Sequence, residues 1–283
     1  MKTYVQQIML GSVTSNEKNA SMTLKRIKDA GYDGIELNSF MIHPTSMMVR
    51  AMTKAAGMPT GKGGKLDWHR LIEDAGLEVA SVHTDLGSLE RDVISVAKEV
   101  KSFDTNTAVI TGMYRFDYTD EREVNNLAKR LNEAGKRLRD EGVRLLYHNH
   151  NVELLNVTKE NRAYDILIDM TDKEYVNFEF DSFWFTDGGA DAKEWMRRLG
   201  TRMKLWHVTD RGSRQIGQSM TPILKCDSLE LGSGNMNLEG LKAIALDNGV
   251  DKVVLESHKN WIDNDPVKSI EISGKYLSGW KEM

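Results

Sequence analysis

One arrangement of apolar and polar residues recurs along the chain: an amphipathic stretch ends in glycine, and a short apolar run follows. Glycine readily adopts the left-handed conformation that closes a helix. Short apolar runs without strict alternation are typical of parallel strands that are buried on both faces. Five segments have this form: AGYDGIEL, AGLEVASVH, EGVRLLYHNH, LGTRMKLWHV and NGVDKVVLESH, with Gly31, Gly76, Gly142, Gly200 and Gly249 at the joints.

Helical periodicity between these runs completes the pattern. Residues 120–141 place their apolar side chains on one face, with lysines and arginines elsewhere, and residues 93–100 predict a second helix. Further apolar runs lie near residues 4–10, 107–111 and 177–181. About eight strand-then-helix units result, which predicts an α/β fold, a (β/α)8 TIM barrel forming one domain over residues 1–283. An open doubly wound sheet is the alternative.

Two segments are longer than ordinary connections. They are residues 40–65, which are rich in methionine and end in PTGKGGK, and residues 210–235. In a barrel both would lie at the carboxyl ends of the strands, where long loops form lids or partner surfaces.

Composition narrows the classes of partner. The formal net charge is −4 and the basic residues are scattered, so we expect no nucleic-acid partner. The chain has one cysteine, Cys226, which excludes an internal disulfide and favours a reducing cytoplasm. No apolar run approaches the ~20 residues of a membrane span, so we expect neither membrane insertion nor export.

Acids and histidines follow the apolar runs. The active site of a parallel barrel is built where its strands end, and five of the seven histidines lie at such ends. A helix cap or a satisfied core group is the alternative for any single residue. The strand-end residues are Glu36, Asn38, His83, His148, His150, Asp181, His207, Glu256 and His258.

Several carboxylates buried close together require positive charge among them, and a divalent cation supplies it. Three carboxylates and one imidazole suit Mn²⁺, with Mg²⁺, Co²⁺ or Zn²⁺ as alternatives.

Four motifs, in this order and spacing, resemble the xylose-isomerase-like TIM-barrel superfamily of sugar isomerases and epimerases, particularly its branch with a YHNHxxEF motif on strand five. They are YHNHNVEL, FEFDSFWF, KLWHVTDR and VVLESH. The resemblance runs from AGYDGIEL to the C-terminal helix. It implies a Glu, Asp, His, Glu metal site, whose last three ligands carry over onto Asp181, His207 and Glu256.

The first ligand departs from the pattern of many relatives. They place that glutamate in an ENH sequence, whereas this chain has His148-Asn149-His150. Glu153 is therefore expected to supply the missing carboxylate, with His148 as the alternative ligand.

The chemistry that this resemblance implies is proton abstraction next to the carbonyl of a sugar or keto-sugar, through an enediolate. His150, Glu153 and Glu256 are the expected acid and base groups. Trp184 can stack on a sugar or fill the barrel top, and Arg211 can hold substrate or pair with an acid. The expected substrate-binding residues are Glu36, Asn38, His83, His148, Trp184, Arg211 and His258.

The resemblance implies two functions, and a third function of a different class stays open beside them. The first is isomerisation or epimerisation of a sugar or keto-sugar. The second is a lyase that cleaves 3-keto-glycosides, such as the catalytic subunit of a C-glycoside deglycosidase, whose partner is a small β-rich protein. The third is a non-catalytic carbohydrate-binding protein. Residues 40–65 suit a bulky aglycone, a partner subunit or a lid, and a homo-oligomer is the other expected assembly.

Overall fold

A computed structural model describes residues 1–44, 63–218 and 220–281. Its parallel strands follow the order β1-β10-β7-β6-β5-β4-β3-β2 of a closed barrel, as the spacing of apolar runs predicts, and the open doubly wound sheet is excluded. The barrel strands are β1 Lys2–Gln6, β2 Gly34–Asn38, β3 Glu78–Thr84, β4 Thr107–Thr111, β5 Arg144–His148, β6 Val176–Asp181, β7 Met203–Val208 and β10 Lys252–Leu255.

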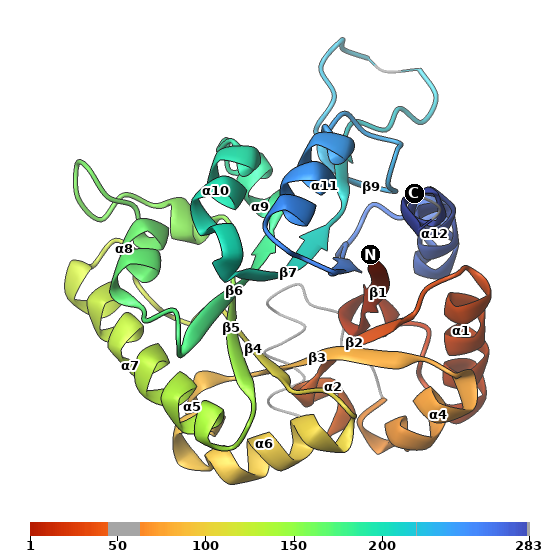
Figure 1. Cartoon of the computed structure of the whole chain (residues 1–283). Coiled ribbons are helices and arrows are strands. Elements are labelled where there is room, and N and C mark those ends of the chain that lie inside the picture. Colours follow the sequence, from red (N-terminus) through yellow and green to blue (C-terminus); the bar gives the residue numbers. More distant parts are fainter. Residues whose placement is uncertain (45–62, 219, 282–283) are drawn as a thin grey trace. The chain divides into compact units, whose positions relative to one another are not determined.

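Helices occupy most of the connections between these strands (Figure 1). The α-helices are α1 Glu17–Asp29, α2 Ser39–Ile42, α4 Trp68–Ala75, α5 Leu86–Arg91, α6 Val93–Ser102, α7 Glu121–Asp140, α8 Ala163–Met170, α9 Ser182–Asp187, α10 Ala192–Leu199, α11 Leu238–Asp247 and α12 Pro266–Lys281. Short 3-10 helices are η1 Gln7–Leu10, η2 Gly63–Lys65, η3 Val152–Leu154, η4 Gly200–Arg202 and η5 Ile262–Asn264.

The glycine joints predicted from sequence adopt backbone conformations that other residues rarely take, although Gly200, with φ 51° and ψ −134°, lies outside the left-handed helical region. All five glycines, from Gly31 to Gly249, have positive φ angles. The predicted helix at 120–141 is α7, capped by the Asp120 side chain, and the second predicted helix is α6. Local signals therefore define where most helices end and where most strands begin.

The chain divides into two compact units. The first contains residues 1–80, 207–240 and 252–283, and the second contains residues 81–206 and 241–251. In the first, β1 pairs in parallel with β2 and β10. In the second, β4 pairs with β3 and β5, and β5 pairs with β6. The prediction that residues 1–283 form one domain stays a prediction.

The second unit shows how the helices cover its strands. α7 packs against α8 and β5 (Figure 1). It buries the apolar face that the periodicity predicts, which includes Val124, Leu127, Ala128, Leu131 and Leu138.

Two predicted segments differ in detail from the structure. The run near 4–10 is a strand only as far as Gln6, because the Gln6 side chain accepts a hydrogen bond from the Ile8 backbone and begins the 3-10 helix η1. The segment 210–235 contains an antiparallel hairpin of β8 Asp210–Gly212 and β9 Asp227–Leu229.

For the two long segments, residues 40–65 and 210–235, the role of a lid or a partner surface stays a prediction. Ile216, Met220 and Ile223 are largely exposed in the connection between β8 and β9, which leaves a lid or a partner surface as an expectation. Residues 45–62, most of the methionine-rich segment, lie outside the described residues. Among the described helices, none has the length and apolar composition needed to cross a membrane.

Candidate active site

The acids and histidines predicted at strand ends lie there in the structure. Asn38, His148 and Asp181 are the last residues of β2, β5 and β6, and Glu256 directly follows β10. His83 and His207 are each the penultimate residue of a strand. These placements follow from the apolar runs, because each run ends where the polar residue begins.

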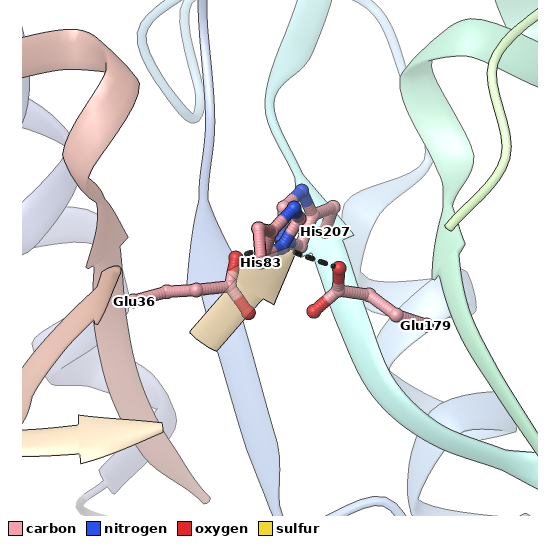
Figure 2. A group of neighbouring side chains, drawn as sticks. All are labelled: Glu36, His83, Glu179 and His207. Carbon is pink, nitrogen blue, oxygen red and sulfur yellow. Dashed lines mark hydrogen bonds and ion pairs between the residues drawn. The ribbon is translucent and has the colours of Figure 1, made fainter. Parts of the chain in front are cut away.

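In the first unit, one imidazole lies between two carboxylates. His207 Nε2 lies 2.6 Å from Glu36 Oε2, and His207 Nδ1 lies 2.9 Å from Glu256 Oε2. Figure 2 shows the Glu36 carboxylate directed at the His207 ring. A neutral imidazole carries only one N–H, so the second contact requires an added proton or a cation near these groups. All three side chains are buried, which makes uncompensated negative charge expensive.

Carboxamides that the sequence prediction did not include hold Glu36 in place. Gln6 Nε2 donates to Glu36 Oε2 over 3.1 Å, and Gln6 Oε1 accepts from Asn38 Nδ2 over 2.6 Å. Gln7 Oε1 accepts from the Asn38 backbone N–H over 2.8 Å. Asn38 therefore supports the carboxylate through Gln6. The sequence offered one signal for this contact, because Gln6 is a polar residue at the end of the apolar run that forms β1.

Glu256 is held as a carboxylate. Burial alone would raise its pKa, but the charges and hydrogen bonds of His258 and His207 lower the pKa well below its ordinary value. His258 Nε2 lies 3.5 Å from Glu256 Oε1. Glu256 is therefore ionised at neutral pH and can bind a cation or accept a proton.

In the second unit, the arrangement is reversed: one carboxylate lies between two imidazoles. Glu179 Oε2 lies 3.0 Å from His83 Nε2 and 3.2 Å from His148 Nδ1. Figure 2 shows Glu179 directed at the His83 ring. The other ring nitrogen of His83, Nδ1, lies 2.7 Å from Thr111 Oγ1.

Glu179 is absent from the sequence prediction although a signal for it exists. It precedes Asp181 by two residues on β6, and side chains two apart on a strand point to the same face. When an acid at the end of a strand is predicted to lie in the site, an acid two residues before it is therefore predicted to lie on the same face.

Asp181 begins helix α9. Its Oδ1 accepts from the Trp184 backbone N–H over 3.0 Å, and its own backbone exchanges two hydrogen bonds with the Asn149 side chain. The Trp184 ring lies 5.6 Å from the His150 ring, measured between centroids. Trp184 and His150 are half-buried, so the Asp181 cap places an aromatic face beside a partly accessible imidazole.

Glu153 lies on η3 and is fully buried. Its Oε1 accepts from Tyr147 Oη over 2.7 Å, and its Oε2 accepts from the His150 backbone N–H over 2.9 Å. Burial raises the pKa of Glu153, against the opposing effect of these hydrogen bonds. Both carboxylate oxygens thus accept hydrogen bonds from β5 and from the residues directly after it.

Arg211 lies on β8. Its backbone N–H donates to Asp210 Oδ1 over 2.8 Å, and its carbonyl accepts from the Asn235 N–H over 2.9 Å. A substrate contact by Arg211 stays a prediction.

Two groups of four buried residues offer ligand atoms that all lie within 4.8 Å of one another. They are Glu36, His83, Glu179 and His207 (Figure 2), and His148, Asp181, His207 and Glu256. Their donors are imidazole nitrogens and carboxylate oxygens, a set that suits Mn²⁺ and Zn²⁺. The residues therefore fit a divalent cation. Glu153 belongs to neither group, whereas His148, the alternative first ligand, belongs to the second.

Solved structures share this fold. A sugar phosphate isomerase/epimerase from Parabacteroides distasonis aligns with a TM-score of 0.75 at 21% identity, over 98% of this chain and 93% of its own. The IOLI protein with a bound zinc atom aligns with a TM-score of 0.65 at 16% identity, over 100% of this chain and 99% of its own.

Two relatives and a family model match the sequence of this chain. An inosose dehydratase from Clostridium perfringens is 27% identical over 211 residues, 69% of this chain and 67% of its own length. The same enzyme from another strain is 31% identical over 131 residues, but the match spans only 42% of its length. The model of the xylose isomerase-like TIM-barrel family matches residues 24–272. This chain, with acids and histidines at the ends of six of its eight parallel strands, therefore belongs to the xylose isomerase-like TIM-barrel family.

Proposed function

We propose that this protein is a divalent-metal-dependent enzyme that removes the proton next to the carbonyl of a keto-sugar or keto-polyol. The observation that carries the proposal is the burial of imidazoles and carboxylates together at the strand ends. A protein that only needed to fold would gain stability from apolar side chains at such positions. The family and the names of its sugar-modifying members support the same class of substrate.

The proposed ligands are His148, Asp181, His207 and Glu256. His148 is preferred to Glu153 because it belongs to a group of close ligand atoms, while both Glu153 oxygens already accept hydrogen bonds. Two imidazoles and two carboxylates suit Mn²⁺, and Zn²⁺ is the alternative that the zinc-bound IOLI protein supports. When bound, such a cation would polarise the substrate carbonyl and stabilise negative charge on its oxygen.

His150 is the proposed base. Its ring is partly accessible and stands beside Trp184, a ring that can stack on the apolar face of a sugar. A neutral imidazole is well matched to proton transfer near pH 7. Glu256, ionised at neutral pH, is the second group able to accept the proton.

Two outcomes begin with this same proton removal. If a hydroxyl on the neighbouring carbon departs, the product is a dehydrated ketone, and the curated relatives named inosose dehydratases favour this lyase outcome. If the proton returns to the other face or the neighbouring carbon, the product is an epimer or isomer, which the similar structure of a sugar phosphate isomerase/epimerase favours. Expulsion of the aglycone of a 3-keto-glycoside instead of a hydroxyl would give the keto-glycoside lyase.

Proton exchange tests the proposal. The protein would be loaded with Mn²⁺ and incubated in D₂O with an inosose and, separately, with a 3-keto-glucoside. Loss of the α-proton signal in the NMR spectrum reports abstraction, and mass spectrometry of the product reports loss of water or of the aglycone. We expect His150→Ala and Glu256→Gln each to slow exchange by about 100-fold or more.

The matched control is His69→Ala, which removes an exposed histidine outside both groups and should leave exchange unchanged. Near-normal exchange in both His150→Ala and Glu256→Gln would disprove the mechanism. Metal binding with no exchange on either ketone would instead favour a carbohydrate-binding protein.

A further inference from the structure

Glu153 is the centre of a hydrogen-bonded network within the second unit. Its two carboxylate oxygens accept hydrogen bonds from different parts of one short segment: Tyr147 Oη at 2.7 Å and the His150 backbone N–H at 2.9 Å. The 3-10 helix η3 turns the chain so that residue 153 returns to the end of β5. Glu153 therefore fixes the backbone on which His150 stands.

The network continues to the neighbouring strand. Tyr118 Oη lies 3.0 Å from Tyr147 Oη, and the Met113 backbone N–H donates to Tyr118 Oη over 2.9 Å. Met113 follows the end of β4, which pairs with β5. The chain of contacts from Met113 through both tyrosines to Glu153 thus joins the ends of two adjacent strands.

Gly112 shows how closely these groups converge. A Cβ atom added at Gly112 would lie 3.3 Å from Tyr118 Oη, 3.5 Å from His150 Nδ1 and 3.6 Å from Glu153 Oε1. Three polar atoms of the network, including one on the His150 ring, therefore surround one position over Gly112. The ring of His150, as well as its backbone, lies against this network.

Burial makes the network sensitive to the loss of any member. Tyr118, Tyr147 and Glu153 are buried, and a hydrogen bond lost there leaves its partner without water to replace it. Tyr164 offers a contrast in the same unit. It is equally buried, but its hydroxyl has no hydrogen-bond partner among the described residues.

From these contacts we infer that Glu153 is a positioning residue rather than a metal ligand: with Tyr147 and Tyr118, it holds His150 in place for proton transfer. The role of His150 as the base rests on the proposed function, whereas the network itself does not. Glu153 acts through the His150 N–H and through the packing of the ring over Gly112.

Metal content separates the two roles of Glu153. Glu153→Gln keeps one acceptor oxygen and the shape of the side chain, and Glu153→Ala removes both oxygens. Both proteins, loaded with Mn²⁺ and passed through a desalting column, should retain the wild-type metal content by plasma mass spectrometry. A fall toward zero in both would make Glu153 a ligand and overturn the inference. Thermal unfolding of each variant checks that it is folded.

A double-mutant cycle tests the path through His150. We expect Glu153→Gln to slow α-proton exchange on the inosose by about 10-fold and to leave KM within about 2-fold. Glu153→Ala should slow it further, so that the conservative variant rescues part of the activity. In a His150→Ala background, Glu153→Gln should have no further effect. An equal effect in both backgrounds would show that Glu153 does not act through His150.

Tyrosine variants provide the matched comparison. Tyr147→Phe and Tyr118→Phe each remove one hydroxyl of the network and should slow exchange several-fold. Tyr164→Phe removes an equally buried hydroxyl outside the network and should leave exchange unchanged. Equal losses in all three would assign the effect to general packing and contradict the inference.

A readout without substrate separates this inference from the proposed function. Diethyl pyrocarbonate modifies accessible imidazoles, and peptide mass spectrometry measures its rate at His150. We expect that rate to change several-fold in Glu153→Ala and Tyr147→Phe and to stay unchanged in Tyr164→Phe. If the wild type showed no exchange, the proposed function would fail while this result still supported the positioning role. An unchanged rate in every variant would overturn that role.

Discussion

At the residue scale, one carboxylate joins the first strand to the last helix. Asp33 Oδ2 accepts from the Thr3 backbone N–H at 2.8 Å and from Lys281 Nζ at 2.6 Å. Burial alone would raise the pKa of Asp33, but the hydrogen bonds and charge of these partners lower it below its ordinary value.

This shift predicts acid sensitivity. Because the pKa of Asp33 is lower in the folded than in the unfolded protein, its stabilising effect is present above about pH 4 and is lost as the pH falls through the folded pKa. We expect Asp33→Asn to lower the free energy of unfolding by about 1 kcal/mol at pH 7 and by much less near pH 3. Urea unfolding of the wild type and the variant at several pH values measures the change in the free energy of unfolding at pH 7 and near pH 3.

The control for this prediction is Asp29→Asn. Asp29 pairs with Lys25 on the exposed surface of α1, so its loss should change stability by less than about 0.5 kcal/mol. A pH-independent effect of Asp33→Asn would contradict the assignment.

At the element scale, α7 depends on a glycine inside a helix. A Cβ atom at Gly135 would lie 2.3 Å from the backbone carbonyl oxygen of Tyr175, far inside van der Waals contact. The helix therefore approaches the segment before β6 more closely than any side chain at this position would permit. Gly279 in α12 has no heavy atom within 4 Å of an added Cβ.

The two glycines predict opposite outcomes for the same substitution. Alanine normally stabilises a helix interior by up to about 1 kcal/mol relative to glycine, and Gly279→Ala should show part of that gain. Gly135→Ala should instead lower stability by about 2 kcal/mol, because the backbone of residue 175 must move. Thermal unfolding of both variants measures the difference. A stabilising Gly135→Ala would mean that α7 can shift freely.

At the scale of the whole molecule, a cation should stabilise the folded protein. A ligand that binds only the folded state at 100 times its Kd adds about 2.7 kcal/mol, which for a chain of this length corresponds to a rise in Tm of roughly 5 °C. We expect Mn²⁺ to produce such a rise, EDTA to reverse it, and His207→Ala and Asp181→Asn to abolish it. Differential scanning calorimetry gives the values.

His69→Ala is again the control, and its Tm should rise with Mn²⁺ as in the wild type. An equal rise in His207→Ala and Asp181→Asn would place the cation elsewhere on the molecule.

The sequence by itself determined the alternation of helices and strands and the residues at the strand ends. Those features depend on local properties: the conformational freedom of glycine at five helix ends, the helical period of α7, and the point where each apolar run stops. The amino-acid pattern alone was therefore enough to identify His83, His207 and Glu256 as strand-end residues.

Only the tertiary structure decided which of these side chains meet. Glu153 follows the β5 motif closely enough to resemble a ligand, yet η3 returns it to Tyr147 and the His150 backbone, and no sequence pattern specifies that turn. Glu179 and Gln6 gained their partners from strands that are distant in sequence. Strand periodicity fixes which face a side chain occupies, but the neighbouring charge that determines its role comes from the packing of separate segments.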